Sequence, residues 1–142
     1  MAKVIAVCIS TEKQKPKISL SEALFVKGRG IDGDSHFGTV ERQISLMRSE
    51  DIREAEKEAG FVFPPGALAE NLVIEGLPEE LSPGQTLSIA ENVTLVVVEK
   101  GKRPDEPHSY NYRGWCLLPT KGYFLSVEKG GKVSPNDEVL LK

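Results

Sequence analysis

Short apolar runs that end at glycine- or proline-containing turns recur along the whole chain, and this pattern limits the fold more than any other feature. The runs that read as strands cover residues 4–9, 22–26, 43–46, 72–74, 86–90, 93–99, 123–128 and 137–141. Segments of this length between turn residues are typical of β-strands. Many short strands predict a mainly β fold, a closed or partly open β-barrel with a few peripheral helices.

One segment has the signals of a helix, residues 49–59. Ser49 is a favourable N-cap, acidic residues follow it in the first turn, Lys57 suits the negative end of the helix dipole, and Gly60 can end the helix. Its apolar stripe is thin. We therefore expect this helix to cover the surface of the barrel rather than to build the core.

Length and composition narrow the function classes. A chain of 142 residues predicts one domain over 1–142 with enough length to bury a core. A formal net charge of −3 argues against general nucleic-acid binding, which needs a dominant basic surface. The apolar start is too short for a signal peptide or a membrane span, so we expect a cytoplasmic protein without membrane insertion.

The two cysteines, Cys8 and Cys116, lie far apart and form no Cys-x-x-Cys motif, so neither a zinc ribbon nor a dithiol redox site is predicted. In a reducing compartment a disulfide between them is not expected. Cys8 lies inside an apolar run and is predicted to pack in the core. Cys116 stands beside the only tryptophan, between Arg113 and Lys121, whose positive charges favour a thiolate. It is either a ligand or nucleophile, or a small buried hydrophobe.

A second group of potentially reactive or metal-binding side chains lies at residues 31–38, where Asp32, Asp34 and His36 alternate with other residues around a glycine. Two carboxylates and an imidazole this close can bind a metal or orient a substrate. The spacing lacks the further oxygen ligands of a calcium loop. The alternative is an Asp-Gly turn held by side-chain hydrogen bonds.

Polar residues also stand where loops enter predicted strands: Arg42 with Gln43, and Glu70 with Asn71. They can face a pocket, or they can be a solvated edge and a turn cap respectively. A long irregular segment, residues 101–119, leads to Cys116 and includes Lys102, Arg103 and His108. Loops of that length in compact domains usually carry function.

Five fragments in this order give the chain a resemblance to the MOSC domain family, named for the C-terminal domain of molybdenum cofactor sulfurase. They are Gly30-Ile31-Asp32-Gly33-Asp34-Ser35-His36, Glu41-Arg42-Gln43-Ile44-Ser45-Leu46, Pro65-Gly66-Ala67-Leu68-Ala69-Glu70-Asn71-Leu72, Pro83-Gly84-Gln85, and Cys116 ahead of Gly122-Tyr123-Phe124, Gly130-Gly131 and Asp137-Glu138-Val139. The resemblance implies a MOSC-type barrel with a pterin-based molybdenum cofactor or a sulfur-carrying site. The family cysteine, which is a metal ligand or a persulfide carrier, falls on Cys116.

The resemblance also implies roles for other residues. Arg42 and Asn71 match pocket-lining positions, and Lys102 and Arg103 stand where a cofactor phosphate could be held. Arg113, His36 and Asp34 complete the predicted cofactor-binding set. Some relatives are reductases of N-hydroxylated compounds, and full sulfurases carry a pyridoxal-phosphate domain that extracts sulfur. A single barrel without that domain would act with a cysteine desulfurase or with an electron-donor protein.

Two positions depart from the family pattern. Arg103-Pro104 stands where some single-domain relatives have a Cys-His pair, and Asn136 replaces a glycine before the final aspartate. Three hypotheses stay open: a molybdenum-cofactor site, a sulfur relay, or a non-catalytic module that binds a small anion or cofactor while Cys116 is plain core.

Overall fold

The computed structural model describes residues 2–12, 15–40, 42–101 and 112–142. The predicted cofactor-holding residues Lys102 and Arg103, and also His108, lie outside the described residues. The elements run β1 (Ala2–Ile9), β2 (Ile18–Leu20), β3 (Ala23–Val26), β4 (Gly30–Ile31), β5 (Ile44–Arg48), α1 (Ser49–Ala59), β6 (Leu72–Glu75), β7 (Thr86–Ile89), β8 (Val93–Lys100), α2 (Leu118–Lys121), β9 (Tyr123–Lys129), β10 (Gly131–Val133) and β11 (Glu138–Leu141).

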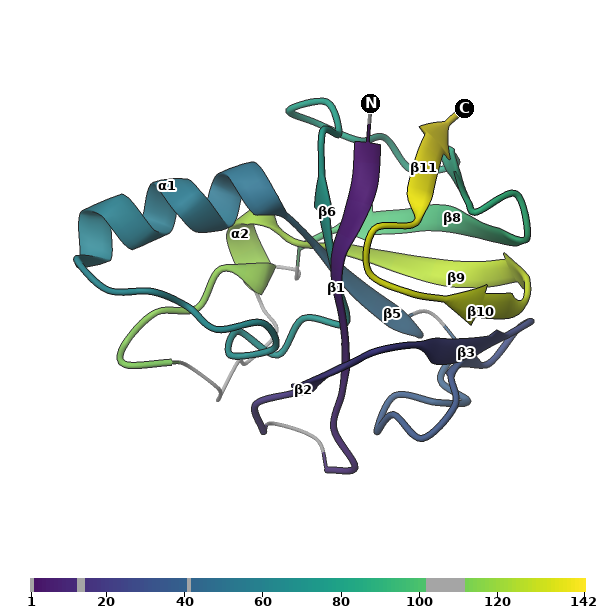
Figure 1. The fold of residues 1–142 in the computed structure, drawn as a ribbon, viewed down its shortest axis with the longest axis horizontal. Helices are drawn as coiled ribbons and strands as arrows, with labels where there is room; N and C mark the ends of the chain where they lie inside the picture. Colours follow the sequence, from purple (N-terminus) through teal and green to yellow (C-terminus); the bar gives the residue numbers. More distant parts are fainter. Residues whose placement is uncertain (1, 13–14, 41, 102–111) are drawn as a thin grey trace.

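Seven strands close into a barrel in the order β1-β11-β7-β8-β9-β5-β6, because β6 pairs with β1 and β11 pairs with β1 as well (Figure 1). The pairing of β5 with β6 is parallel, and the other pairs in the ring are antiparallel. Strand β2 adds to β1 outside the ring, and β10, β3 and β4 form a small second sheet. The predicted mainly β barrel is confirmed.

The parallel pair explains where α1 lies. Two parallel neighbours need a crossover connection, and α1 with the segment that follows it supplies this connection between β5 and β6. The helix covers the predicted residues, Ser49–Ala59, and Gly60 ends it with a φ of 80°. The prediction that Ser49 is the N-cap was wrong, because the extended residue Arg48 precedes the first helical turn, and no side chain caps it.

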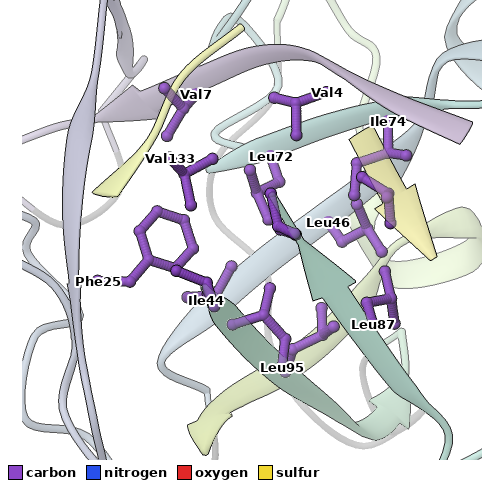
Figure 2. Close-up of a cluster of buried hydrophobic side chains, with 14 of the residues drawn as sticks. Val4, Val7, Phe25, Ile44, Leu46, Leu72, Ile74, Leu87, Leu95 and Val133 are labelled. Atoms are coloured by element: carbon purple, nitrogen blue, oxygen red, sulfur yellow. The ribbon is translucent and has the colours of Figure 1, made fainter. Parts of the chain in front are cut away.

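The core fills the barrel and extends to the small sheet. Alternate residues of the strands point inward, and Figure 2 shows Val4, Ile44, Leu46, Leu72, Ile74, Leu87 and Leu95 converging there with Phe25 and Val133 from the small sheet. Burying an aliphatic or aromatic side chain of this size contributes about 1.5–3 kcal/mol before the entropy cost of ordering it. The barrel interior is therefore packed, and a ligand site has to lie outside it.

A second apolar cluster lies outside the barrel wall, under α1. Because side chains alternate along a strand, Ile44 and Leu46 of β5 face the interior while Met47 faces this second cluster. Ile52 and Ala55 of α1 pack on it together with Leu118 of α2. Tyr112 and Trp115 pack against the same cluster. The outer cluster thus fixes the loop that carries Cys116 to the barrel.

Candidate functional site around Cys116

Cys116 lies on a loop that is held on both sides. Before it, Tyr112 and Trp115 form a two-residue bridge, in which each N–H donates to the other's carbonyl at 2.7 and 2.8 Å. Arg113 and Gly114 make the tight turn between them, with φ values of 50° and 86°. After it, α2 begins at Leu118, which is buried. The Cys116 side chain is partly exposed in this position, and both Cys116 and Cys8 are thiols rather than disulfide partners.

Aromatic rings pack against the loop that carries Cys116. Phe63 meets Trp115 with ring centroids 6.0 Å apart and Tyr112 at 5.8 Å, both nearly edge to face. The exposed Arg113 places its guanidinium 5.1 Å from the ring centroid of Phe61 and 5.7 Å from that of Tyr112. Such cation–π contacts hold a charge in place at an exposed site. The charged side chain of Arg113, three residues before Cys116, is therefore held over the rings of Phe61 and Tyr112.

Gly101 marks the start of the segment that leads to Cys116. Its N–H donates to the carbonyl of Gly122 at 2.7 Å, its φ is 65°, and a Cβ there would collide with the carbonyl oxygen of Pro119 in α2. Lys102 and Arg103 follow it directly in sequence. On the other side of residues 102–111, Tyr112 pairs with Trp115, the residue next to Cys116.

Arg42, which was predicted to line the pocket, lies two residues before β5. Its Nε donates to Glu99 Oε1 at 2.8 Å, and its guanidinium carbon lies 4.9 Å from the ring centroid of Phe124. Both partners of the ion pair remain about a quarter exposed. Glu99, near the end of β8, thus already balances part of the charge of Arg42.

Asp34 is buried, and its carboxylate is bound within the fold. Oδ1 accepts from Lys17 Nζ at 2.7 Å and from the Ser10 N–H at 3.1 Å, and Oδ2 accepts from the His36 N–H at 3.2 Å. Burial raises the pKa of Asp34, but the hydrogen bonds from His36 and Lys17 and the charge of Lys17 outweigh it and hold the pKa well below its usual range. The Asp34 carboxylate is therefore charged and fully engaged.

His36 is the more accessible member of this loop. Its side chain is about one third exposed, and Nδ1 lies 3.7 Å from Asp34 Oδ2. Among the described residues, no group of three histidine, cysteine, aspartate or glutamate side chains is arranged to hold a metal ion. The contacts of Asp34 match the turn alternative for residues 31–38 better than the metal alternative.

Asn71 is likewise built into the barrel wall. Its Oδ1 accepts from the N–H and the hydroxyl of Ser45 at 2.9 and 3.2 Å, and its Nδ2 donates to the carbonyl of Cys8 at 3.0 Å. The residue is 1% exposed. These bonds tie β1, β5 and the start of β6 together, so the described contacts of Asn71 are with the fold itself.

Cys8, whose carbonyl accepts from Asn71, has no exposed surface. The prediction that Cys8 packs in the core is confirmed. Burial, reinforced by the charge of nearby Glu70 and opposed by that of Lys17, raises the pKa of the Cys8 thiol to about 12. A thiol with that pKa is almost entirely protonated near neutral pH and is a poor nucleophile. The two cysteines therefore differ in burial: Cys8 is fully buried and Cys116 is partly exposed.

Sequence reasoning missed the buried Lys17 but singled out the buried Glu70. Lys17 is 3% exposed and pairs with Asp34. Glu70 is buried, accepts the N–H groups of Gly66 and Leu68 at 3.0 Å each, and has a pKa raised by burial. Of the two interpretations of Glu70, a pocket-facing residue or a turn cap, these contacts match the turn cap. No local signal marks Lys17, because its partner is 17 positions away.

The structure brings the predicted residues together only in part. Arg113 stands three residues before Cys116 on the same loop, and the described residues on either side of 102–111 bond near it, Gly101 to Gly122 and Tyr112 to Trp115. Arg42 has partners on other strands, whereas the side chains of Asp34 and Asn71 bond within the fold.

In the described part of the chain, no helix is long and apolar enough to cross a bilayer.

Comparison with known proteins places the chain in a family. Crystal structures with the same fold include the YuaD protein from Bacillus subtilis, with 23% identity and a TM-score of 0.78 over 99% of this chain and 96% of that one. YiiM from Geobacillus stearothermophilus matches with 17% identity and a TM-score of 0.70 over 100% and 75% of the two chains. YiiM from Escherichia coli matches with 21% identity and a TM-score of 0.67 over 99% and 69%.

No curated protein matches the sequence at a significant level. The family model described as MOSC domain matches residues 32–140, which is most of the chain. That span includes the strands β5 to β9, α1, and the whole loop around Cys116. The chain belongs to the MOSC domain family.

Proposed function

We propose that this MOSC domain holds a pterin-based molybdenum cofactor, with the Cys116 thiolate as the protein ligand of the metal. The observation that carries the proposal is the contrast between the two thiols. Cys116 is partly exposed on a fixed loop, whereas Cys8 is fully buried with a pKa of about 12. A soft thiolate is a suitable donor for a soft or heavy metal centre.

The residues near Cys116 fit such a group. Cys116 offers one thiolate donor, which suits a metal that arrives already chelated by its organic cofactor. Arg113 supplies positive charge on the same loop, three residues before Cys116, with its guanidinium over the ring of Phe61. Lys102 and Arg103 follow Gly101, which is packed on α2, and are the proposed partners of the cofactor phosphate, since lysine and arginine are strong phosphate donors.

When bound, molybdenum would supply two-electron redox chemistry. This chain's own contribution is to hold the thiolate in a fixed loop, between the Tyr112–Trp115 bridge and α2. The contact between the rings of Phe63 and Trp115 packs that loop against the outer apolar cluster. Electrons would come from a partner protein, which is part of the proposal.

Anaerobic reconstitution with the cofactor followed by metal analysis tests the ligand role. We expect molybdenum in the wild type and in Cys8→Ser, and its loss in Cys116→Ser. Cys8→Ser is the matched control, because it removes a thiol of the same chain that is buried in the core. Equal molybdenum content in wild type and Cys116→Ser contradicts the assignment of Cys116 as ligand.

A second function, a sulfur relay, is supported by the same exposure of Cys116 at the protein surface. In this scheme the Cys116 thiolate attacks the terminal sulfur of a persulfide on a cysteine desulfurase. The S–S bond of the donor breaks, a new S–S bond forms at Cys116, and the donor cysteine leaves as a thiolate, so no oxidant is needed.

Intact-protein mass spectrometry distinguishes the relay from the ligand role. After incubation with a cysteine desulfurase and cysteine, the relay predicts one added sulfur atom on the wild type and on Cys8→Ser, and none on Cys116→Ser. An unmodified Cys116 that still reacts with an alkylating agent counts against the relay and leaves the ligand role as the proposed function.

A further inference from the structure

A surface rich in aromatic rings reaches Cys116 through its neighbour Trp115, on the side of the barrel that carries α1 (Figure 1). Phe61 and Tyr112 connect its two segments, with ring centroids 6.3 Å apart. We call it the aromatic surface, and its members, all at least partly exposed, are Phe61, Val62, Tyr112, Arg113 and Trp115. Val62 is aliphatic, yet 69% of it is exposed. Contiguous exposed apolar groups mark binding sites, whereas isolated ones do not.

Arg113 supplies the charge of this surface. Its guanidinium carbon lies 5.1 Å from the ring centroid of Phe61 and 5.7 Å from that of Tyr112, so it contacts both segments. Within the described ranges, Arg113 forms no ion pair. A carboxylate next to the surface, that of Glu56, is directed to the backbone, where its Oε2 accepts the Phe63 N–H at 2.8 Å. The surroundings of Arg113 thus hold its charge in place without neutralising it.

The backbone at Arg113 supports a role for this arginine independently of its side-chain contacts. Tyr112 and Trp115 close a two-residue turn, and the central residues Arg113 and Gly114 have φ values of 50° and 86°. Such turns prefer asparagine, aspartate or glycine at the first central position, because few other residues tolerate a positive φ. An arginine there costs conformational energy. Strain of this kind is characteristic of active sites and ligand clamps.

The residue types of the aromatic surface match a protein interface. Aromatic residues and arginine are enriched at the centres of protein–protein interfaces and carry much of the binding energy there. The rings are already packed on Phe63, with Trp115 at 6.0 Å and Tyr112 at 5.8 Å between centroids. Little side-chain freedom is therefore left to lose when a partner binds, which favours affinity.

We propose that the aromatic surface is the docking site of a small acidic electron-carrier protein, whose carboxylates face Arg113. This carrier is the electron donor that the proposed function requires, so the inference rests on that function. Because each residue spans at most about 3.6 Å, the Cα atoms of Arg113 and Cys116 lie within about 11 Å, and a protein held at Arg113 reaches the surroundings of the thiol. An unbalanced positive charge selects a negatively charged partner. Electron-transfer complexes also use small interfaces, which suits a surface of this extent.

NMR titration of the isotopically labelled full chain tests the docking site. The probes are a ferredoxin and a flavodoxin from the same organism, two classes of acidic electron carrier, added at low salt. With at least one of them we expect the amide signals of residues 61–62 and 112–117 to shift, and the shifts to shrink strongly at about 0.5 M salt because charges are then screened. The amides of β10, which Figure 1 shows away from α1, should not shift. No shifts with either carrier, or shifts confined to other surfaces, overturn the proposal.

Charge variants separate Arg113 from the net charge of the chain. Arg113→Gln removes the charge and should raise the dissociation constant of the carrier roughly fivefold or more. Arg113→Lys keeps the charge and should bind more tightly than Arg113→Gln. Lys132→Gln changes the net charge by the same amount on β10, beside Glu22, so affinity should change little. Equal weakening by Arg113→Gln and Lys132→Gln would show that net charge alone governs binding and would overturn the assignment.

A second pair of variants tests the apolar part of the surface. Val62→Ser should weaken the carrier roughly threefold or more, because the exposed methyl groups of Val62 are then lost from the interface. Leu140→Ser is the control, since Leu140 is also an exposed aliphatic residue, 47% exposed, but lies on β11. Urea midpoints show that both variants remain folded. Wild-type affinity in a folded Val62→Ser would contradict the assignment of the aromatic surface as the docking site.

Cys116→Ser separates this inference from the proposed function. It should bind the carrier with wild-type affinity, because docking uses the surface around the thiol and not the sulfur itself. If Cys116→Ser loses molybdenum while neither carrier shifts the signals of the aromatic surface in the wild type, the ligand role stands and the docking site is wrong. If its molybdenum content equals that of the wild type while a carrier shifts those signals, the docking site stands and the proposed ligand role fails.

Discussion

Lys17 Nζ lies 2.7 Å from Asp34 Oδ1, and the two side chains are 1% and 0% exposed. This buried ion pair fastens the loop at residues 31–38 to the chain between β1 and β2. The same carboxylate also accepts the backbone N–H groups of Ser10 and His36. The pair therefore has a structural role, and it explains why a loop rich in polar residues is ordered against the barrel.

Breaking this pair on one side should be costly. Lys17→Met leaves the Asp34 charge buried without its main partner, so we expect the free energy of unfolding to fall by about 3–5 kcal/mol. The double variant Lys17→Met with Asp34→Leu should recover much of the loss. Urea denaturation measures both, with Lys132→Met, whose partner Glu22 is exposed, as a control that changes little. A double variant as unstable as the single one contradicts the pair's role.

The pH dependence of stability should carry the signature of Asp34. Because the pKa of Asp34 is lower in the folded state than its ordinary value of 3.8, the pair stabilises the protein fully above that value, and its contribution is lost as pH falls further. The wild type should lose stability from about pH 4 downward more steeply than Asp34→Asn does. Urea midpoints measured between about pH 7 and pH 3 test this. Parallel curves for the two proteins rule out the lowered pKa.

Gly101 and Gly28 form a matched pair for testing the anchor of the Cys116 segment. Both have positive φ, 65° and 71°, but a Cβ at Gly101 would collide with Pro119 in α2, whereas at Gly28 nothing lies within 4 Å. Gly28→Ala should cost about 1–2 kcal/mol from backbone strain alone. Gly101→Ala should cost more and should shift α2.

The single tryptophan of the chain, Trp115, precedes Cys116 and reports on this shift. We expect the emission maximum of Trp115 to change in Gly101→Ala and to stay unchanged in Gly28→Ala. The same fluorescence signal follows the urea transition of both variants. Identical spectra and identical stabilities would mean that α2 absorbs the extra methyl group and does not depend on Gly101.

Asn71 should matter for stability through its internal hydrogen bonds. Asn71→Ala leaves the Ser45 N–H and the Cys8 carbonyl without their side-chain partner in a buried site, which should cost about 2–4 kcal/mol. Asn92→Ala, at an exposed turn, is the control and should change stability by less than about 0.5 kcal/mol. If cofactor binding is lost in Asn71→Ala while the urea midpoint is unchanged, Asn71 faces the ligand instead.

The strands were predictable where the chain itself carries the signal. Runs such as that of β8, Val93–Lys100, are long, rich in β-branched residues and bounded by turns. The strands β2, β4 and β10 have three, two and three residues and were not predicted. Elements this short exist because a neighbouring strand supplies their hydrogen bonds. The one-turn α2 was missed for a related reason, since it is stabilised by packing on the outer cluster.

Residues of the candidate site were predictable only where the local sequence around a residue indicates its environment. A cysteine inside an apolar run and a cysteine in a broken, charged segment indicate different environments, and the structure gives Cys8 and Cys116 different burial. The partners of Asn71 could not be predicted, because Cys8 lies 63 positions away and Ser45 lies 26 away.

The central claim is that function resides in Cys116, the reachable thiol, and its most direct test is residue-resolved alkylation of the native protein with iodoacetamide. At about pH 7.5 we expect Cys116 to react at an ordinary thiol rate, and Cys8, with its pKa of about 12 and no exposed surface, to react only after denaturation. Peptide mass spectrometry over time gives both rates. Comparable labelling of both cysteines, or a Cys116 that reacts only after unfolding, would contradict the account.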